Sequence, residues 1–350
     1  MNDIPLVSIV IPCRNEEKFI VKCLDSIINN DYPKDQLEVL IIDGMSEDKT
    51  RDIIKEYTQQ HPFIRLLDNP KRIAPSALNI GIENAKGEII MRMDAHVTYE
   101  KDYISKCVSY MEKYKVDNVG GACITISGNN TLVSKAIALV LSSPFGVGNS
   151  YFRIGVNKPK EVDTVPFGCY RRELFNRIGL FNERLIRTED IEFNARIRKD
   201  GGKIMIFPDI ISYYYARPSL SKLFKQYLST GTWKIYLIKM LPGGLSLRHF
   251  VPLVFTLSLI GSSIMSLFLN YAWITLVLIS VSYLFTSLVF SAKIAFSKGI
   301  RYLPVLPVVF ICLHFSYSLG MIRGILTNRR FSKDAKINKN LARIKVDKKY

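Results

Sequence analysis

The chain has 350 residues, a net charge of +17 and six cysteines. This length allows about two domains, and the basic balance favours an anionic partner such as a phosphorylated ligand, a nucleic acid or a membrane surface. The cysteines form no CxxC pair, which argues against a zinc site or a disulfide framework. The N-terminus runs directly into an apolar stretch and then into charge, so we expect no signal peptide.

Short apolar runs alternate with amphipathic stretches through the first hundred residues. The runs are typical of strands buried on both faces, and the stretches between them have helical periodicity. One helix is expected to begin at 46–48, where Ser, Glu and Asp supply N-cap chemistry. This alternation predicts an α/β domain with a mostly parallel, Rossmann-like sheet. The expected strands are 7–11, 37–42, 63–67 and 88–93, and the expected helices include 16–30 and 75–85.

Polar side chains follow three of these strands. The carboxyl ends of parallel strands lie at one sheet edge, where ligands bind in open α/β sheets. We therefore expect a nucleotide site there, in which carboxylates accept hydrogen bonds from a base or ribose and Arg72 binds a diphosphate. The residues at this edge are Pro12, Arg14, Asn15 and Glu16 after the first strand, Asp43 and Ser46 after the second, and Asp94 and His96 after the fourth.

Asp94 and His96 are the centre of this arrangement, in the stretch GEIIMRMDAHVT at 87–98. A carboxylate and an imidazole at a strand end are suited to holding a divalent metal against a phosphate. Mg²⁺ takes one or two carboxylates together with phosphates and water, whereas an imidazole shifts the preference toward Mn²⁺. Taken alone, the pair is better explained by an Asp that opens a turn beside a solvated His. The neighbouring polar clusters favour the metal site.

These motifs together resemble the family 2 glycosyltransferases of GT-A fold, and most of all the ExoA-like branch named for succinoglycan-type polysaccharide synthesis. The resemblance implies a nucleotide-diphosphate sugar donor and Mg²⁺ or Mn²⁺ as cofactor. It places Asp43 at the position that contacts the base and Asp94 at the first aspartate of the DxD motif, whose second aspartate is here His96. The motifs that carry it are VSIVIPCRNEE, DGMSEDKT, KRIAPSALNIGIENAKGE, MDAH, SPFGVGN and RTEDIEFNARIRKDGG.

Glu189 and Asp190 open a predicted helix at 191–199. An acidic pair at a helix start is also explained by its favourable interaction with the helix dipole. The resemblance places Asp190 at the family's general-base position, with Glu189 beside it. We therefore expect an inverting single displacement in which Asp190 takes the acceptor proton while the metal stabilises the leaving diphosphate.

Between these sites lie candidate acceptor-binding segments. An apolar helix is predicted at 132–141, a glycine-rich loop at 144–149, and a strand at 162–165 that leads through 166–170 into a helix from 171. Ordinary packing and turn roles explain these segments equally well. Two further strands are predicted at 203–207 and 210–215.

The chain changes character after residue 218. Residues 219–241 predict an amphipathic helix in the membrane interface, with Lys222, Lys225 and Lys234 away from its apolar face. A surface helix packed on the sheet is the alternative. Apolar segments at 250–269, 272–290 and 303–322 are each long enough to span a membrane. His314 in the third segment is expected to pack against a neighbouring helix.

The basic loop 291–302 and the basic tail both favour the cytoplasmic side, where the nucleotide donor also requires the catalytic domain. Three complete spans would put the tail on the other side. Either the third segment is re-entrant at its prolines, or the tail breaks the positive-inside rule. We expect a multi-pass cell-membrane protein with a catalytic domain at 1–218, an interface helix region at 219–245, two to three transmembrane helices at 246–325 and a basic cytoplasmic tail at 326–350.

The predicted enzyme is a membrane-anchored glycosyltransferase of exopolysaccharide or cell-envelope biosynthesis. It moves a sugar from its nucleotide donor to a polysaccharide or lipid-linked oligosaccharide acceptor. The alternatives are a polyprenyl-phosphate sugar transferase and a non-catalytic scaffold of polysaccharide export. The presence of Asp43, Asp94 and Asp190 disfavours the scaffold, and we expect these carboxylates to surround one cavity. No groove-reading motif accompanies the positive charge, so no nucleic-acid partner is expected.

Overall fold

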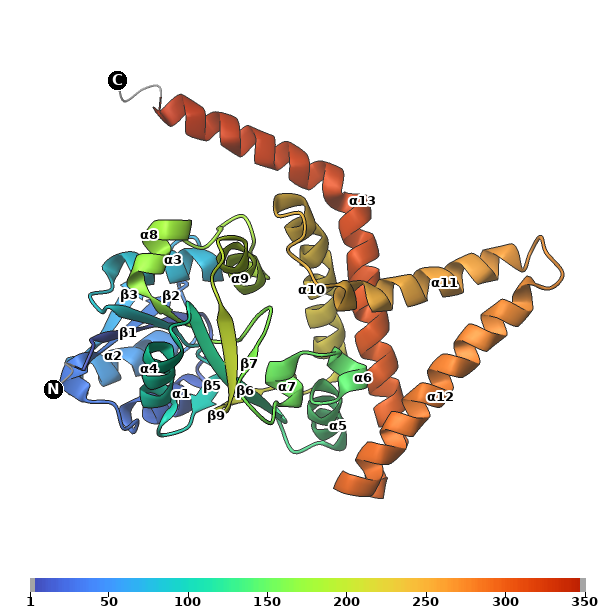
Figure 1. Cartoon of the computed structure of the whole chain (residues 1–350), viewed down its shortest axis with the longest axis horizontal. Coiled ribbons are helices and arrows are strands. Elements are labelled where there is room, and N and C mark those ends of the chain that lie inside the picture. The colour runs from blue at the N-terminus through green and yellow to red at the C-terminus, as the bar shows by residue number, and fades with distance from the viewer. Residues whose placement is uncertain (1–3, 347–350) are drawn as a thin grey trace.

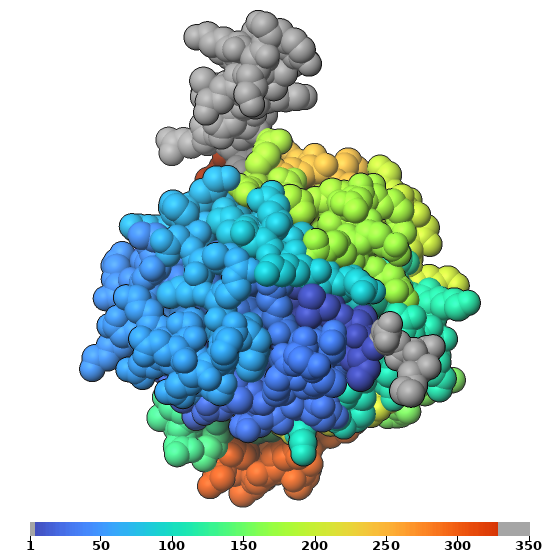
Figure 2. Space-filling model, turned by 90° about the vertical axis from the view of Figure 1, so that its left-hand side faces the viewer, coloured from blue at the N-terminus to red at the C-terminus, as the bar shows by residue number. Residues whose placement is uncertain are grey.

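An α/β domain carries a group of long helices on one side (Figure 1). The computed structural model describes residues 4–346, with side chains described up to residue 327. Residues of the first hundred, blue to cyan, cover most of the end of the molecule that faces away from these helices (Figure 2). The two parts therefore present different surfaces, one built by the N-terminal sheet and one by the C-terminal helices.

Four parallel strands form the first half of the sheet, in the order β3-β2-β1-β4. The register pairs Cys13 with Asp43 at the ends of β1 and β2, so the polar residues that follow these strands meet at one edge. The strands and helices expected here all form, with boundaries within four residues of those predicted. The elements are β1 (Val7–Cys13), α1 (Ile20–Ile28), η1 (Lys34–Gln36), β2 (Leu37–Asp43), α2 (Thr50–Gln60), β3 (Ile64–Asp68), α3 (Ala74–Asn84) and β4 (Ile89–Arg92).

Helix α2 begins at Thr50 rather than at 46–48. Two side-chain bonds explain the difference. The hydroxyl of Ser46 donates to Asp43, and Asp48 accepts from the backbone N–H of Thr50 at 3.0 Å. The segment is therefore a loop tied back to the sheet edge instead of a first helical turn.

Alternate residues of β1 enter two separate cores. Ile9 and Ile11 belong to the core that also contains Leu24 of α1. Val10 belongs to the core on the other face, with Leu78 of α3. Side chains alternate across a strand, so this arrangement explains why the strand is apolar at nearly every position. Burial on both faces fixes its register and hence the place of the residues that follow it.

The second half of the sheet is mixed. Strand β8 pairs antiparallel with β4 and β6, while β9 pairs parallel with β6 and antiparallel with β5 and β7. The two strands expected at 203–207 and 210–215 form one strand, β9, with an irregularity opposite Gly121 and Ala122. The elements are β5 (Val97–Tyr99), α4 (Tyr103–Tyr114), β6 (Asn118–Ile126), β7 (Lys160–Glu161), β8 (Cys169–Arg171), α8 (Arg172–Ile178), α9 (Glu189–Lys199) and β9 (Ile204–Tyr215).

The strand predicted at 162–165 does not form. Its polar side chains are committed to distant partners: Thr164 accepts from Asn194 at 2.8 Å, and Asp163 accepts from Arg248. The strand that does form here is β8, three residues beyond Pro166. The loop expected at 144–149 contains a short helix, α6 (Pro144–Val147), which lies between α5 (Leu132–Leu141) and α7 (Tyr151–Ile154).

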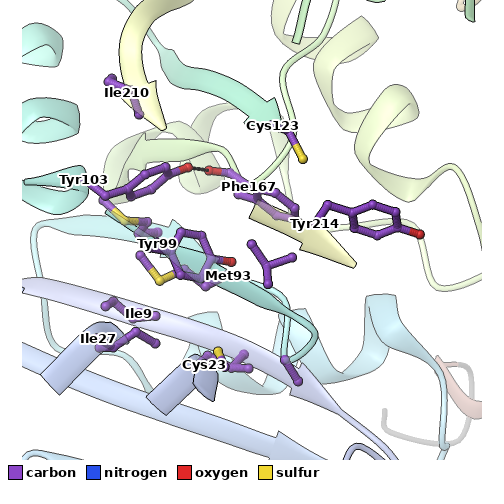
Figure 3. Packing of buried hydrophobic residues seen from close by; sticks show 14 of the residues in the cluster. Ile9, Cys23, Ile27, Met93, Tyr99, Tyr103, Cys123, Phe167, Ile210 and Tyr214 are labelled. Carbon is purple, nitrogen blue, oxygen red and sulfur yellow. Dashed lines mark hydrogen bonds between the residues drawn. The ribbon is translucent and has the colours of Figure 1, made fainter. Parts of the chain in front are cut away.

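Aromatic side chains fill the core under the mixed half of the sheet (Figure 3). The ring of Tyr99 lies 4.9 Å from that of Tyr103 and 5.9 Å from that of Phe167, both in edge-on contact. The phenol of Tyr103 also donates to the carbonyl of Phe167 at 3.4 Å. This packing supports the turn between β4 and β5, because Tyr99 Oη accepts from the backbone N–H of Asp94 at 2.8 Å.

Among the residues that the structure describes, three helices are long and apolar enough to cross a membrane, as expected from the sequence. Helices α11 and α12 form a hairpin that points away from the α/β domain, while α13 runs beside α10 (Figure 1). The third segment lies, from Leu306 on, in a single continuous helix, with Pro304 before the helix and Pro307 in its first turn. The elements are α10 (Leu220–Met240), η2 (Leu247–Phe250), α11 (Val251–Met265), α12 (Ala272–Lys298), η3 (Ile300–Tyr302) and α13 (Leu306–Val346).

Glycines bring α10 and α13 into backbone contact. A Cβ on Gly231 would collide with the carbonyl of Tyr317, and one on Gly320 would collide with the carbonyl of Leu228. Such close approach of small residues is a common way to pack apolar helices. The tail expected at 326–350 continues α13 as far as Val346. Its last four residues and its side chains beyond residue 327 lie outside what the structure describes.

Candidate functional site: two cavities that meet at one loop

A cavity of about 330 Å³ opens at the carboxyl ends of β1, β2 and β4. We call it the sheet-edge cavity. It lies where the sequence predicts a nucleotide site, and Pro12, Arg14, Glu16, Arg72, Asp94 and His96 line it as expected. Its full lining is Pro12, Cys13, Arg14, Glu16, Gly44, Asn69, Arg72, Ile73, Ala74, Ala77, Arg92, Asp94, His96 and Arg187.

Arg92 links Asp94 to the start of α9. Its Nε donates to Asp94 Oδ1 at 3.1 Å, and its Nη1 lies 3.0 Å from Glu189 Oε1. The Glu189 side chain is only 7% exposed. Burial raises the pKa of Glu189, although the charge of Arg92 opposes the shift. This buried ion pair fixes the turn after β4 against the loop that carries Asp190.

Asp94, His96 and Glu16 are the side chains of this cavity that could contribute ligands to a metal ion. His96 Nδ1 lies 3.1 Å from Glu16 Oε1, and all three side chains line the sheet-edge cavity. No group of three or more His, Cys, Asp or Glu within the described residues is arranged to hold a metal by itself. The set fits a hard divalent cation that completes its shell with phosphate oxygens and water.

Asp43 lies beneath the cavity wall rather than in it. Its carboxylate is fully buried, and it accepts from Arg51 Nη1 at 2.6 Å and from the Ser46 backbone at 3.0 Å. Asn15 joins the same network, because its backbone N–H donates to Ser46 Oγ at 2.8 Å. In this structure Asp43, Ser46 and Asn15 hold the loops after β1 and β2 together.

Strained backbone is concentrated around the sheet-edge cavity. Asn15, Met45, Arg72 and Thr188 have positive φ values of 54°, 58°, 57° and 65°. A positive φ costs free energy for any residue other than glycine. Such a conformation persists where the surrounding structure enforces it, often at functional sites. Three of these residues lie in the loops after β1, β2 and β3, and Thr188 joins Arg187 of the cavity wall to Glu189.

A second cavity, of about 510 Å³, lies between the α/β domain and the C-terminal helices. We call it the helix-side cavity. Its wall is mostly apolar and includes residues of all three candidate membrane helices, together with Asp190, Lys234 and Arg248. The residues that line it are Pro144, Phe145, Gly146, Val147, Gly148, Ser150, Phe152, Arg153, Thr164, Asp190, Ile191, Tyr227, Thr230, Lys234, Arg248, His249, Val251, Pro252, Phe255, Tyr283, Leu313, His314 and Tyr317.

The three carboxylates that we expected around one cavity are divided. Asp94 lines the sheet-edge cavity, Asp190 lines the helix-side cavity, and Asp43 lines neither. The segment 187–190 contributes to both cavities, because Arg187 at its start lines the first and Asp190 at its end lines the second. The site is therefore two compartments that share this loop.

Comparison with known proteins identifies the family to which this chain belongs. Residues 8–179 match the family model described as Glycosyl transferase family 2. A dolichyl N-acetyl-alpha-D-glucosaminyl phosphate 3-beta-D-2,3-diacetamido-2,3-dideoxy-beta-D-glucuronosyltransferase from Methanococcus voltae is 34% identical over 328 residues, covering 91% of this chain and 98% of that protein. The chain belongs to glycosyltransferase family 2.

Two further similarities agree with this glycosyltransferase assignment. The succinoglycan biosynthesis protein ExoA from Rhizobium meliloti is 30% identical over 327 residues, covering 92% of this chain and 96% of that protein. The solved structure of mannosyltransferase PcManGT from Pyrobaculum calidifontis, in complex with GDP-Man and Mn2+, has a TM-score of 0.57 at 18% identity and covers 90% of this chain and 88% of that chain. The GT-A fold expected from the sequence is confirmed.

Sequence reasoning missed Arg92, Arg187 and Lys234 of this glycosyltransferase. The sequence pattern could have pointed to Arg92, because it is the one charged residue inside the apolar run of β4. Lys234 was expected on the polar face of an interface helix, yet it is only 3% exposed. That prediction was wrong because α13 packs on α10, which the sequence of one helix does not reveal.

Proposed function

We propose that this glycosyltransferase moves a sugar from a nucleotide-diphosphate sugar in the sheet-edge cavity to an acceptor in the helix-side cavity, with inversion at the anomeric carbon. The observation that carries the proposal is the position of segment 187–190 between the two cavities. If the donor and the acceptor bind on the two sides of this segment, their reacting groups meet beside it. Asp190 then lies on the acceptor side. A general base must act on that side.

The sheet-edge cavity suits a diphosphate. Arg14 and Arg72 each lie 3.7 Å from Glu47, which is a loose contact, and both side chains are at least 40% exposed. A bound diphosphate would give both guanidinium groups shorter, charge-assisted hydrogen bonds. Arg187, an exposed residue that also lines the cavity, adds a third positive charge. In this proposal Asp43 contacts the base only if its ion pair with Arg51 opens.

Asp94 would hold a Mg²⁺ or Mn²⁺ ion, with His96 and Glu16 beside it. When bound, the cation supplies Lewis-acid stabilisation of the negative charge on the leaving diphosphate. The chain's own residues fix where that charge develops: Arg92 holds one oxygen of Asp94 at 3.1 Å and leaves the carboxylate facing the cavity. Asp94 is thereby positioned before any ligand arrives.

Asp190 acts as the general base. Its Oδ1 accepts from the backbone N–H of Ile191 at 2.8 Å, which holds the carboxylate at the start of α9. The carboxylate takes the proton of the acceptor hydroxyl as that oxygen bonds to the anomeric carbon. The bond from this carbon to the donor diphosphate breaks at the same time, and the configuration inverts. Glu189, held by Arg92, is a positioning residue for this loop.

The acceptor in this proposal is linked to a lipid. The Methanococcus voltae relative is named for a dolichyl-phosphate-linked sugar, and ExoA is named for a polysaccharide. The wall of the helix-side cavity favours the lipid-linked class, because it includes apolar residues of α11, α12 and α13. A free polysaccharide would gain little from such a wall.

The C-terminal helices anchor the enzyme in unequal ways. Only 17% and 11% of the most apolar windows of the first two helices are buried within the protein, against 50% for the third. We propose that the α11–α12 hairpin crosses the membrane and that α13 stays at the cytoplasmic surface, docked on α10. This topology puts the loop 291–302 and the tail on the same side, which resolves the conflict with the positive-inside rule.

Purified full-length protein tests the proposed function directly. We would incubate it with a panel of UDP-, GDP- and TDP-sugars, with and without Mg²⁺ or Mn²⁺, and measure release of the nucleotide. The expected result is metal-dependent hydrolysis of one donor class, which is accelerated by a lipid-linked acceptor. Metal-independent turnover, or none of any donor with acceptor present, would contradict the proposal.

A further inference from the structure

Lys234 is a buried cation with no counterpart. Its side chain lies on α10 and is 3% exposed, and within the part of the chain that the structure describes it has no hydrogen bond or ion pair. An isolated ammonium group is costly to bury unless it is paired. The amine borders the helix-side cavity, so a ligand in that cavity can supply the missing negative charge.

The neighbouring charges leave Lys234 uncompensated. Arg248 donates twice to Asp163, at 2.8 and 2.9 Å, and Asp163 also accepts from Ser246 at 2.5 Å. Arg248 is therefore neutralised within the protein. Asp190 lies close enough to Lys234 to oppose the loss of its charge, yet it makes no ion pair with it among the described residues. Lys234 is therefore a cation of this wall that no ion pair neutralises within the described residues.

The remaining wall of the cavity is apolar and reaches the membrane helices. Val251 and Phe255 come from α11, and Leu313 comes from α13. The outer faces of α11 and α12 are exposed apolar surface that fits a bilayer. Tyr317 adds a buried hydroxyl that has no hydrogen-bond partner in the described structure. An occupant must therefore combine an anionic group with a hydrocarbon chain.

We propose that Lys234 binds the phosphate of a lipid-linked acceptor, with the lipid chain along α11 and α13 and the sugar end at Asp190. This inference rests on the proposed function, because it takes Asp190 as the base that the acceptor must reach. It adds a binding site for the acceptor phosphate on α10. Lys234 recognises the phosphate linkage and does not take part in proton transfer.

The test compares two probes that differ only in the anionic group. Farnesyl phosphate and farnesol would be titrated into full-length protein in detergent, and binding would be measured by calorimetry. Wild-type protein is expected to prefer the phosphate by about tenfold or more, the size of one charge-assisted hydrogen bond. Lys234→Met, which keeps the volume but not the charge, should lose this preference, and Lys234→Arg should keep much of it.

Lys225→Met is the matched control, because Lys225 is an exposed lysine on the same helix. It should bind both probes as wild type does. Equal phosphate preference in Lys234→Met and wild type would overturn the inference. So would competition by inorganic phosphate or phosphatidylglycerol as strong as that of farnesyl phosphate, since the site would then recognise any phosphate or any anionic lipid.

Failure of this inference can be told apart from failure of the proposed function. Metal-dependent donor hydrolysis by wild-type protein, measured without acceptor, does not require a phosphate bound at Lys234. If the donor is hydrolysed and the Lys234 variants bind farnesyl phosphate normally, the phosphate site alone is wrong. If no donor is hydrolysed with or without acceptor, the proposed function fails first and the inference fails with it.

Discussion

The two cavities differ in how their charges are satisfied. In the sheet-edge cavity every buried charge has a partner: Arg92 pairs with Asp94 and Glu189, and His96 contacts Glu16. In the helix-side cavity the wall is mostly apolar and Lys234 has no partner among the described residues. The first region fits the charged donor that we propose for it, because its own charges are already paired. The second fits the proposed lipid-linked acceptor, which would bring both hydrocarbon and a negative charge.

Removal of the proposed base should produce the largest effect. Asp190→Asn is expected to lower sugar transfer about 10²- to 10⁴-fold, the usual contribution of a general base, while nucleotide binding stays near normal. Transfer would be measured with a lipid-linked acceptor and binding by calorimetry. Asp52→Asn, which removes an exposed carboxylate on α2, is the control. Near-normal transfer by folded Asp190→Asn would remove Asp190 from the mechanism.

Loss of Arg92 should destabilise the protein around the sheet-edge cavity. Arg92→Met leaves the Glu189 carboxylate buried without its cation, which costs about 3–5 kcal/mol. Thermal unfolding in detergent would show a lowered Tm, and Arg92→Met with Glu189→Gln should recover part of the loss. Arg198→Met removes an exposed arginine on α9 and should leave Tm unchanged. Simple additivity of the two changes would mean that Arg92 and Glu189 are not coupled.

The contact between α10 and α13 should tolerate no side chain at Gly231. Gly231→Ala places a methyl group against the backbone of α13 and is expected to cost about 1–3 kcal/mol. Gly261→Ala on α11, where no heavy atom lies within 4 Å of the added Cβ, is the matched control. Comparison of their unfolding temperatures checks the docking. Equal temperatures would show that α13 is not packed on α10 as described.

Binding of the acceptor phosphate should depend weakly on pH. Burial lowers the pKa of Lys234 to about 8, and Asp190 partly opposes the shift, while Arg248 adds to it and Asp163 opposes it. The amine is charged below this pKa and neutral above it, and a phosphate monoester is already a dianion above about pH 6. Affinity for farnesyl phosphate should therefore change little near pH 7, decline as the pH approaches the pKa and fall further above it.

Lys234→Arg should remove this pH dependence, because arginine stays charged throughout the range. Calorimetric titrations of both proteins at a series of pH values provide the comparison. An identical fall of affinity in Lys234→Arg would assign the pH dependence to another group.

Local hydrophobic patterns were enough to predict the strands and helices that are buried. Strands β1 and β2 are apolar at nearly every position because both faces are covered, and α5 forms with the predicted bounds. The strand expected at 162–165 failed because Thr164 binds Asn194, thirty residues away. The predicted residues after β1 and β4 did gather at one edge, since strand order determines their position.

The second compartment was beyond prediction from sequence for a different reason. We expected Asp190 to share a cavity with Asp94, and it lines the helix-side cavity instead. Lys234 lies inside the protein because a helix about ninety residues later packs over α10, as the Thr232 hydroxyl bonded to the Gly320 carbonyl at 3.0 Å shows. Periodicity within one helix carries no information about such a partner.

The central claim is that donor and acceptor occupy separate cavities on the two sides of segment 187–190. A cryo-EM structure of the full-length enzyme with a nucleoside diphosphate, Mn²⁺ and farnesyl phosphate would test it most directly. We predict the diphosphate between Arg72 and Asp94, the farnesyl phosphate at Lys234, and Asp190 facing the space between them. Both ligands in one cavity, or the nucleotide against α11 and α13, would contradict the account.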